Sequence, residues 1–337
     1  MDATAITDSG AGRSAASITL ENIGKVYPDG TVAVGDISLE VPAGQLVVLI
    51  GPSGSGKSTV LRMINRLIEP SKGAIKIDGT DVTAQDPTEL RRKIGYVIQN
   101  VGLFPHQTIR TNVGTVPRLL GWNRKRVNAR ADELLDMVGL DPKRYATRYP
   151  NELSGGQRQR VGVARALAAD PLVLLMDEPF SAVDPIVRAR LQEEFLRLQA
   201  TVRKTIVLVT HDIDEAVRLG DRIAVIGEGG RLLQYDTPPV LLSNPASETV
   251  REFVGADRGI RRLTVTPIRD AMRALGQIED IGRLPTVEAD GTLYDALAAM
   301  LTADSHNVVV LENNEPIGTV SRSAIFEVPN QEAAARV

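Results

Sequence analysis

The chain has 337 residues, of which 43% are hydrophobic and 24% are charged, and its formal net charge is −3. This length predicts about two domains with substantial cores, and the near-neutral charge gives no reason to expect a nucleic-acid partner. No apolar run approaches the roughly 18 residues that a membrane-spanning helix needs, so we expect no direct insertion into a bilayer. The absence of cysteine excludes disulfides and cysteine metal sites.

The first segment of the chain predicts no folded structure. Residues 1–17 are rich in Ala, Gly, Ser and Thr, and they lack the charged start and the apolar stretch of a secretory signal. We therefore expect a disordered tail over these residues.

A glycine-rich loop follows the first strongly apolar segment. Leu46–Ile50 predicts a buried strand, Ser58–Ile64 predicts a helix, and the sequence between them fits G-x-x-x-x-G-K-[ST]. Such glycines let backbone N–H groups converge on a phosphate, and the helix N-terminus adds partial positive charge there. A plain Gly/Ser turn is the alternative, but the flanking strand and helix favour a phosphate-binding loop. Its residues are Gly51, Ser53, Gly54, Ser55, Gly56, Lys57, Ser58 and Thr59.

Two acidic residues end a second apolar run. Residues 172–176 predict a buried strand, and Asp177 and Glu178 follow it, at the edge where ligands bind in open α/β sheets. Alone they could equally be solvated surface groups, but the phosphate loop favours a catalytic role. We expect Lys57 to reach the terminal phosphates, Ser58 and Asp177 to hold Mg²⁺, and Glu178 to orient or deprotonate the attacking water.

Two further polar residues follow predicted strands. His211 comes after the apolar run 205–209, and Gln99 comes after the run 94–98. Each could be a structural residue at a strand end. Beside a phosphate site, His211 is a candidate to contact the terminal phosphate, and Gln99 is a candidate to sense that phosphate or the metal.

A second anion-binding element is predicted far along the chain from the first. Leu153-Ser154-Gly155-Gly156-Gln157 precedes a helical run over 157–168, so Ser154, Gly155 and Gly156 form another helix N-terminus.

These motifs, in this order, resemble the ATPase subunits of ABC transporters over residues 18–255. The resemblance implies ATP and Mg²⁺ as cofactors and catalytic roles for Lys57, Glu178 and His211. It also implies ATP contacts by Tyr27, which would stack on adenine, by Gln157 beside Ser154, and by Asp184. The implied fold class is α/β: a P-loop NTPase cassette with a RecA-like core, an antiparallel β subdomain and a helical subdomain.

The resemblance further implies an ATP-dependent homodimer. The two copies would pair head to tail, with each ATP between Lys57 of one copy and Ser154 of the other.

A smaller α/β domain is predicted after the cassette. Residues 256–262 suggest a linker, residues 263–330 resemble a single CBS repeat, and residues 331–337 form a tail. Two such repeats usually form one module, so we expect pairing with another chain's copy. Ala324 stands where nucleotide-binding repeats carry Asp, which leaves open whether the repeat binds a ligand, senses ionic strength or only dimerises.

A cassette with a C-terminal CBS unit resembles the importers of glycine betaine, carnitine and choline. This resemblance implies transmembrane permease subunits and an extracytoplasmic substrate-binding protein as partners, and a peripheral location at the cytoplasmic face of the cell membrane. An importer of another small solute, such as an amino acid, is the nearest alternative. A non-transport ABC ATPase is a second one, but a chromosome-maintenance ATPase would insert a long coiled coil between Lys57 and Ser154, where this chain has only a short segment.

Overall fold

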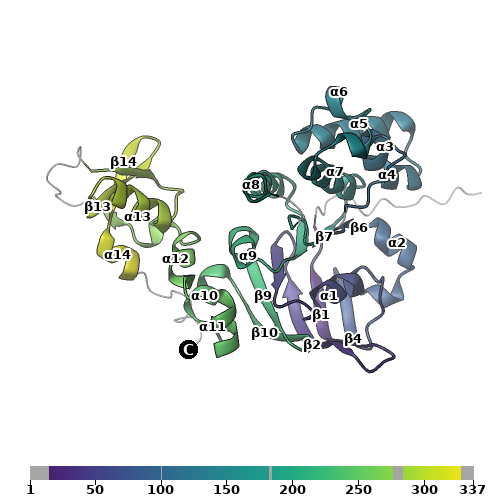
Figure 1. Ribbon diagram of the computed structural model, residues 1–337, viewed down its shortest axis with the longest axis horizontal. Helices are drawn as coiled ribbons and strands as arrows, with labels where there is room; N and C mark the ends of the chain where they lie inside the picture. Colours follow the sequence, from purple (N-terminus) through teal and green to yellow (C-terminus); the bar gives the residue numbers. More distant parts are fainter. Residues whose placement is uncertain (1–14, 100, 182–183, 276–283, 328–337) are drawn as a thin grey trace, which may run out of the picture. The chain divides into compact units, whose positions relative to one another are not determined.

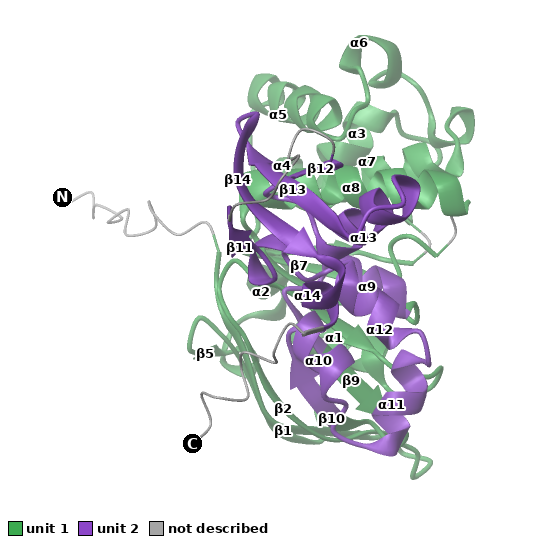
Figure 2. Ribbon diagram, turned by 90° about the vertical axis from the view of Figure 1, so that its left-hand side faces the viewer, with its two compact units in different colours: residues 1–212, 224–232 green, residues 213–223, 233–337 purple. Residues whose placement is uncertain are grey.

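The structure is a computed structural model that describes residues 15–99, 101–181, 184–275 and 284–327 (Figure 1). Most of the predicted N-terminal tail and the whole predicted tail 331–337 lie outside these residues. The chain forms two compact units, residues 1–212 with 224–232 and residues 213–223 with 233–337 (Figure 2).

A large mixed sheet lies mainly in the first unit. Among the described residues it has ten strands, in the order β5-β4-β1-β2-β10-β9-β3-β8-β7-β6. The strands are β1 (Ile18–Val26), β2 (Val32–Val41), β3 (Leu46–Ile50), β4 (Lys72–Ile77), β5 (Thr80–Asp81), β6 (Ile94–Val97), β7 (Val173–Asp177), β8 (Thr205–Val209), β9 (Arg222–Gly227) and β10 (Arg231–Asp236).

The two halves of this sheet differ in direction because their sequences differ in pattern. Strands β3, β7 and β8 are buried along their whole length and pair in parallel, as do β7 and β6. Continuous apolar runs of this kind suit parallel strands that are covered on both faces. Strands β1, β2 and β4 mix buried and exposed positions and pair antiparallel. The predicted parallel core and antiparallel β subdomain are thus confirmed.

One group of helices stands out in the first unit. Figure 1 shows α3 to α7 clustered together, apart from α1 and α2. Helix α5 begins at the cap Asn123, whose side chain accepts the Arg126 N–H, and it ends before Gly139, which has a φ of 71°. The helices are α1 (Lys57–Ile64), α2 (Pro87–Arg92), α3 (Ile109–Val113), α4 (Thr115–Leu119), α5 (Arg124–Met137), α6 (Pro142–Tyr145), α7 (Gly155–Leu167) and α8 (Pro185–Val202), with the 3-10 turns η1 (Val82–Ala84) and η2 (Pro150–Glu152).

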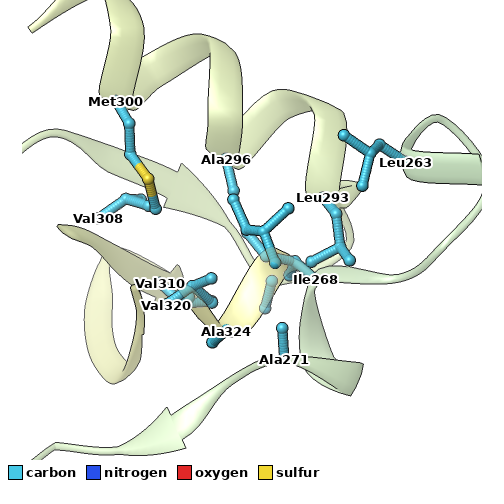
Figure 3. Packing of buried hydrophobic residues seen from close by; sticks show 12 residues of the cluster. Leu263, Ile268, Ala271, Leu293, Ala296, Met300, Val308, Val310, Val320 and Ala324 are labelled. Atoms are coloured by element: carbon cyan, nitrogen blue, oxygen red, sulfur yellow. The ribbon is translucent and has the colours of Figure 1, made fainter. Parts of the chain in front are cut away.

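The second unit contains a small sheet with its own core. The sheet order is β11-β14-β13-β12, and the β13–β14 turn has Asn313 and Asn314 in left-handed conformations. Ile268, Leu293 and Val308 are among the buried residues between the sheet and its helices (Figure 3). The elements are α9 (Ile213–Leu219), α10 (Pro238–Ser243), α11 (Glu248–Val254), α12 (Arg258–Leu263), η3 (Ile268–Asp270), β11 (Arg273–Ala274), β12 (Thr286–Glu288), α13 (Leu293–Thr302), β13 (Asn307–Glu312), β14 (Glu315–Ser321) and α14 (Arg322–Glu327).

The structure differs from the predicted layout in one segment. Most of the expected linker 256–262 lies in helix α12, which packs against α10 and α13. The segment is helical because Leu263 at its end is buried in the core of the second unit. The charged residues before Leu263 gave no sign of this burial in the sequence. The assignment of a single CBS repeat to 263–330 stays a prediction, as do the other domain boundaries.

None of the helices in the described part of the chain combines the length and the apolar character needed to cross a membrane.

Candidate ATPase site

Polar residues gather at one edge of the parallel half of the sheet. Strands β3, β8, β7 and β6 are neighbours and run in parallel, so their carboxyl ends share this edge. The glycine-rich loop follows β3, His211 follows β8, Glu178 follows β7 and Gln99 follows β6. The sheet topology therefore collects four predicted site segments that lie far apart in the sequence.

Glycine is required at two positions of the loop. Gly51 has a φ of 149°, and a Cβ there would lie 2.0 Å from the carbonyl oxygen of Ile226. Gly56 has a φ of 88°, and a Cβ there would lie 2.1 Å from the carbonyl oxygen of Ala33. Because both neighbours are backbone atoms, any larger residue would displace the loop itself.

Lys57 is held inside this loop. Its Nζ donates to the carbonyl oxygens of Gly51 and Pro52, each at 2.8 Å, and to Ser55 Oγ at 3.3 Å. Burial lowers the pKa of Lys57, and the carboxylates of Glu178 and Asp177 oppose that shift. The ammonium thus lies among neutral oxygens, which a phosphate can replace as a stronger, charged acceptor.

Ser58 and Asp177 lie together, as predicted for a magnesium site. Ser58 Oγ donates to Asp177 Oδ1 at 2.8 Å, and burial raises the pKa of Asp177. Among the described residues no cluster of three His, Asp or Glu side chains could hold a metal. One carboxylate and one hydroxyl fit Mg²⁺, because this ion takes few protein ligands and completes its shell with phosphate oxygens and water.

Glu178 contacts two other predicted site residues. Its Oε2 accepts a hydrogen bond from Gln99 Nε2 at 3.1 Å, and its Oε1 lies 3.3 Å from His211 Nδ1. The backbone of Glu178 has a φ of 46°, which is uncommon outside glycine. Three hydrogen bonds hold it there: its N–H donates to the Val209 carbonyl, and its own carbonyl accepts from Ser181 Oγ and from the Ser181 N–H. Such strain, held by the surrounding backbone, is characteristic of functional sites.

Several of the remaining predicted residues make local contacts. Ser154 caps α7 through the Gln157 N–H, and the Gln157 side chain bonds back to the Ser154 N–H and to Tyr145 Oη. Asp184 caps α8, and Tyr27 lies with its ring centroid 5.5 Å from Lys25 Nζ. These contacts leave the roles proposed for Tyr27, Ser154, Gly155, Gly156, Gln157 and Asp184 as predictions.

Asn112 is a residue that the sequence patterns did not single out. It is completely buried in α3, its Oδ1 accepts the Phe104 N–H at 2.7 Å, and its Nδ2 lies within 3.1 Å of the carbonyl oxygens of Phe104, Gln107 and Thr108. It therefore anchors the loop that leads from Gln99 to α3. A single buried asparagine has no periodicity that would reveal this role.

We expect Asn112→Ala to lower the free energy of unfolding by about 2 kcal/mol, because it leaves buried backbone groups without a partner. Urea denaturation measures this loss. Asn128→Ala on α5, where the side chain is only half-buried, is the control and should change stability by less than about 0.5 kcal/mol. Equal effects in the two variants would contradict the anchoring role.

Comparison with known proteins identifies the family of this chain. A family model described as "ABC transporter" matches residues 34–181. The glycine betaine/carnitine/choline transport ATP-binding protein OpuCA of Bacillus subtilis is 48% identical over 331 residues, which is 92% of this chain and 84% of OpuCA. The chain belongs to the ATP-binding subunits of ABC transporters. The osmoprotectant import ATP-binding protein OsmV of Salmonella typhimurium is also 48% identical, over 90% of this chain and 79% of OsmV.

A solved structure agrees with this assignment. The ABC transporter cassette MJ0796, in a dimeric structure, aligns with a TM-score of 0.59 and 37% identity over 65% of this chain and 98% of MJ0796. A second structure of MJ0796 is dimeric and bound to ADP and Pi. This ABC subunit is thus an ATPase whose cassette fold and family are both established, and the predicted fold class and enzyme class are confirmed.

Proposed function

We propose that this ABC ATPase energises the import of a quaternary-amine osmoprotectant of the glycine betaine, carnitine and choline class. The observation that carries the proposal is the 48% identity to OpuCA over 92% of the chain, a match long enough to reach into the second unit. The partners are separate transmembrane permease subunits and an extracytoplasmic substrate-binding protein. The ATPase works at the cytoplasmic face of the membrane without entering the bilayer.

The residues at the sheet edge have different roles in ATP hydrolysis. Lys57 binds the terminal phosphates once ATP displaces its bonds to the loop carbonyls. Glu178 orients the attacking water and takes its proton, while His211 and Gln99 hold the two oxygens of that carboxylate. Ser58, Asp177 and Gln99 are the proposed Mg²⁺ ligands, and the ion would neutralise phosphate charge.

Hydrolysis requires two copies in this proposal. Ser154 begins the 13-residue helix α7, whose N-terminal N–H groups are suited to a phosphate. Head-to-tail pairing would set this helix end of one copy against the ATP held by the other, with Gln157 and Asp184 near the nucleotide. The dimeric state of MJ0796 supports such an arrangement.

Solute uptake tests the proposed substrate class. Cells that produce this chain with its permease and binding protein should accumulate labelled glycine betaine, carnitine or choline, and cells with Glu178→Gln should not. Labelled methionine and polar amino acids form the second arm. Uptake that is restricted to the amino acids would replace the proposed substrate with that of the nearest alternative importer.

Tyr27→Ala tests the proposed adenine contact. We expect the apparent KM for ATP to rise about tenfold with little change in kcat, because stacking on a base contributes roughly 1–3 kcal/mol. Steady-state ATPase assays measure both constants. Tyr294→Ala, at an exposed tyrosine of the second unit, is the control. An unchanged KM in Tyr27→Ala would show that Tyr27 is only a packed loop residue.

A further inference from the structure

Helix α9 belongs to the second compact unit although it directly follows the ATPase site in sequence. Residues 213–223 group with 233–337, and Figure 2 shows α9 in the same colour as α10 to α14. His211 precedes the first residue of α9, Ile213, by two positions. Any displacement of α9 is therefore transmitted to His211 by a very short piece of backbone.

Arg261 ties α9 to helix α12. Its Nε and Nη2 face the two carboxylate oxygens of Asp214, at 2.5 and 3.4 Å. Its Nη1 donates to the Val254 carbonyl at 2.6 Å and to Asp257 Oδ1 at 2.7 Å. The Arg261 side chain is only 19% exposed. A guanidinium with this many fixed acceptors holds one orientation, so it determines where Asp214 lies.

Helix α12 is itself anchored in the small sheet domain. Leu263, two residues after Arg261, is 4% exposed and belongs to the core that includes Ile268 and Leu293. Helix α12 also packs against α10 and α13. The bonds of Arg261 therefore connect α9 to the packed core of the second unit.

The other end of the His211 segment is attached to the sheet. Thr210 donates its N–H to the Leu49 carbonyl at 3.2 Å, and Thr210 Oγ1 accepts the Asp212 N–H at 3.1 Å. The His211 side chain is 60% exposed, so close packing does not set its position. Asp212 Oδ2 also lies 3.5 Å from Arg188 Nη1 on α8. The backbone on either side, strand β8 before it and Asp212 with α9 after it, therefore aims the imidazole at Glu178.

We propose that Arg261 is a positioning residue for His211 and acts through Asp214 and α9. A change that shifts α12 thereby changes the aim of the histidine. This inference rests on the catalytic role proposed above for His211.

The inference specifies which kinetic constant responds. ATP binding by Lys57 and the glycine-rich loop does not involve α9, so loss of the Arg261 bonds should leave the KM for ATP unchanged. A misplaced His211 instead reduces the stabilisation of the transition state for hydrolysis, so kcat should fall. Mutations that act through packed elements typically change the coupled constant by a factor of about two to thirty. We expect kcat to decrease about fivefold.

The experiment measures ATP hydrolysis by the full chain. Arg261→Ala and Asp214→Asn should each lower kcat about fivefold, and the double variant should lower it no further, because both remove one link. Arg251→Ala is the matched control: it breaks an exposed ion pair with Glu248 on the neighbouring helix α11 and should leave kcat unchanged. Asp214→Asn preserves the side-chain shape and serves as the second variant if Arg261→Ala folds poorly.

A His211→Ala background separates positioning from general destabilisation. Without the imidazole, Arg261 has no side chain to position. The double variant should therefore have a kcat within about 1.5-fold of that of His211→Ala alone. A further fivefold loss in this background would overturn the positioning role while leaving the proposed function intact. Wild-type hydrolysis by His211→Ala alone would overturn both the role of His211 and this inference.

Discussion

Lys57→Ala is expected to abolish measurable ATP hydrolysis and to weaken ATP binding. Lys57 is 7% exposed, and its ammonium donates to three oxygens of the loop. Residues 51–59 contain no other cationic side chain that could take its place beside the phosphates. Removal of a single preorganised group at a developing charge lowers kcat by about a hundredfold or more. Steady-state ATPase assays and nucleotide titration measure the two effects.

Lys72→Ala is the control for this experiment. Lys72 forms an exposed ion pair with Asp36 on the antiparallel part of the sheet, and exposed pairs of this kind contribute little to stability. Its ATPase rate should match that of the unmodified protein. If Lys57→Ala retained the same rate, the assignment of the phosphate-binding loop would be wrong.

Glu178→Gln is expected to stop hydrolysis and leave ATP binding intact. The amide keeps the shape of the carboxylate between Gln99 and His211, but it cannot accept the proton of the attacking water. General-base catalysis contributes roughly 10²- to 10⁴-fold, so kcat should fall by that factor. Glu193→Gln, on the exposed face of α8, is the control and should hydrolyse ATP normally.

The same variant tests the proposed dimer. Because ATP would persist at both nucleotide sites of the pair, Glu178→Gln should elute from size-exclusion chromatography as a dimer with ATP and Mg²⁺. A variant that binds ATP and still elutes as a monomer at saturating ATP and Mg²⁺ would argue against head-to-tail pairing, although not against the hydrolytic role of Glu178.

The sequence by itself determined the class of protein and predicted most of the candidate site. The glycine-rich loop depends on local chemistry, since Gly51 and Gly56 need backbone conformations that only glycine adopts freely. The apolar runs of β3, β7 and β8 are long enough to mark buried parallel strands, and the polar residues at their ends follow directly. Local patterns of this kind can be recognised in the sequence because each depends on residues that are adjacent in the chain.

The tertiary structure alone decided how these pieces meet. The contacts of Glu178 with Gln99 and His211 join residues from three different strand ends, and no spacing along the chain specifies them. Asn112 and the Arg261–Asp214 pair were equally hidden, because single polar residues have no periodicity. The segment 256–262 suggested a linker because its charged residues dominate the pattern. It is helical because Leu263 and Arg261 find partners far away in the sequence, and partners of this kind exist only once the chain has folded.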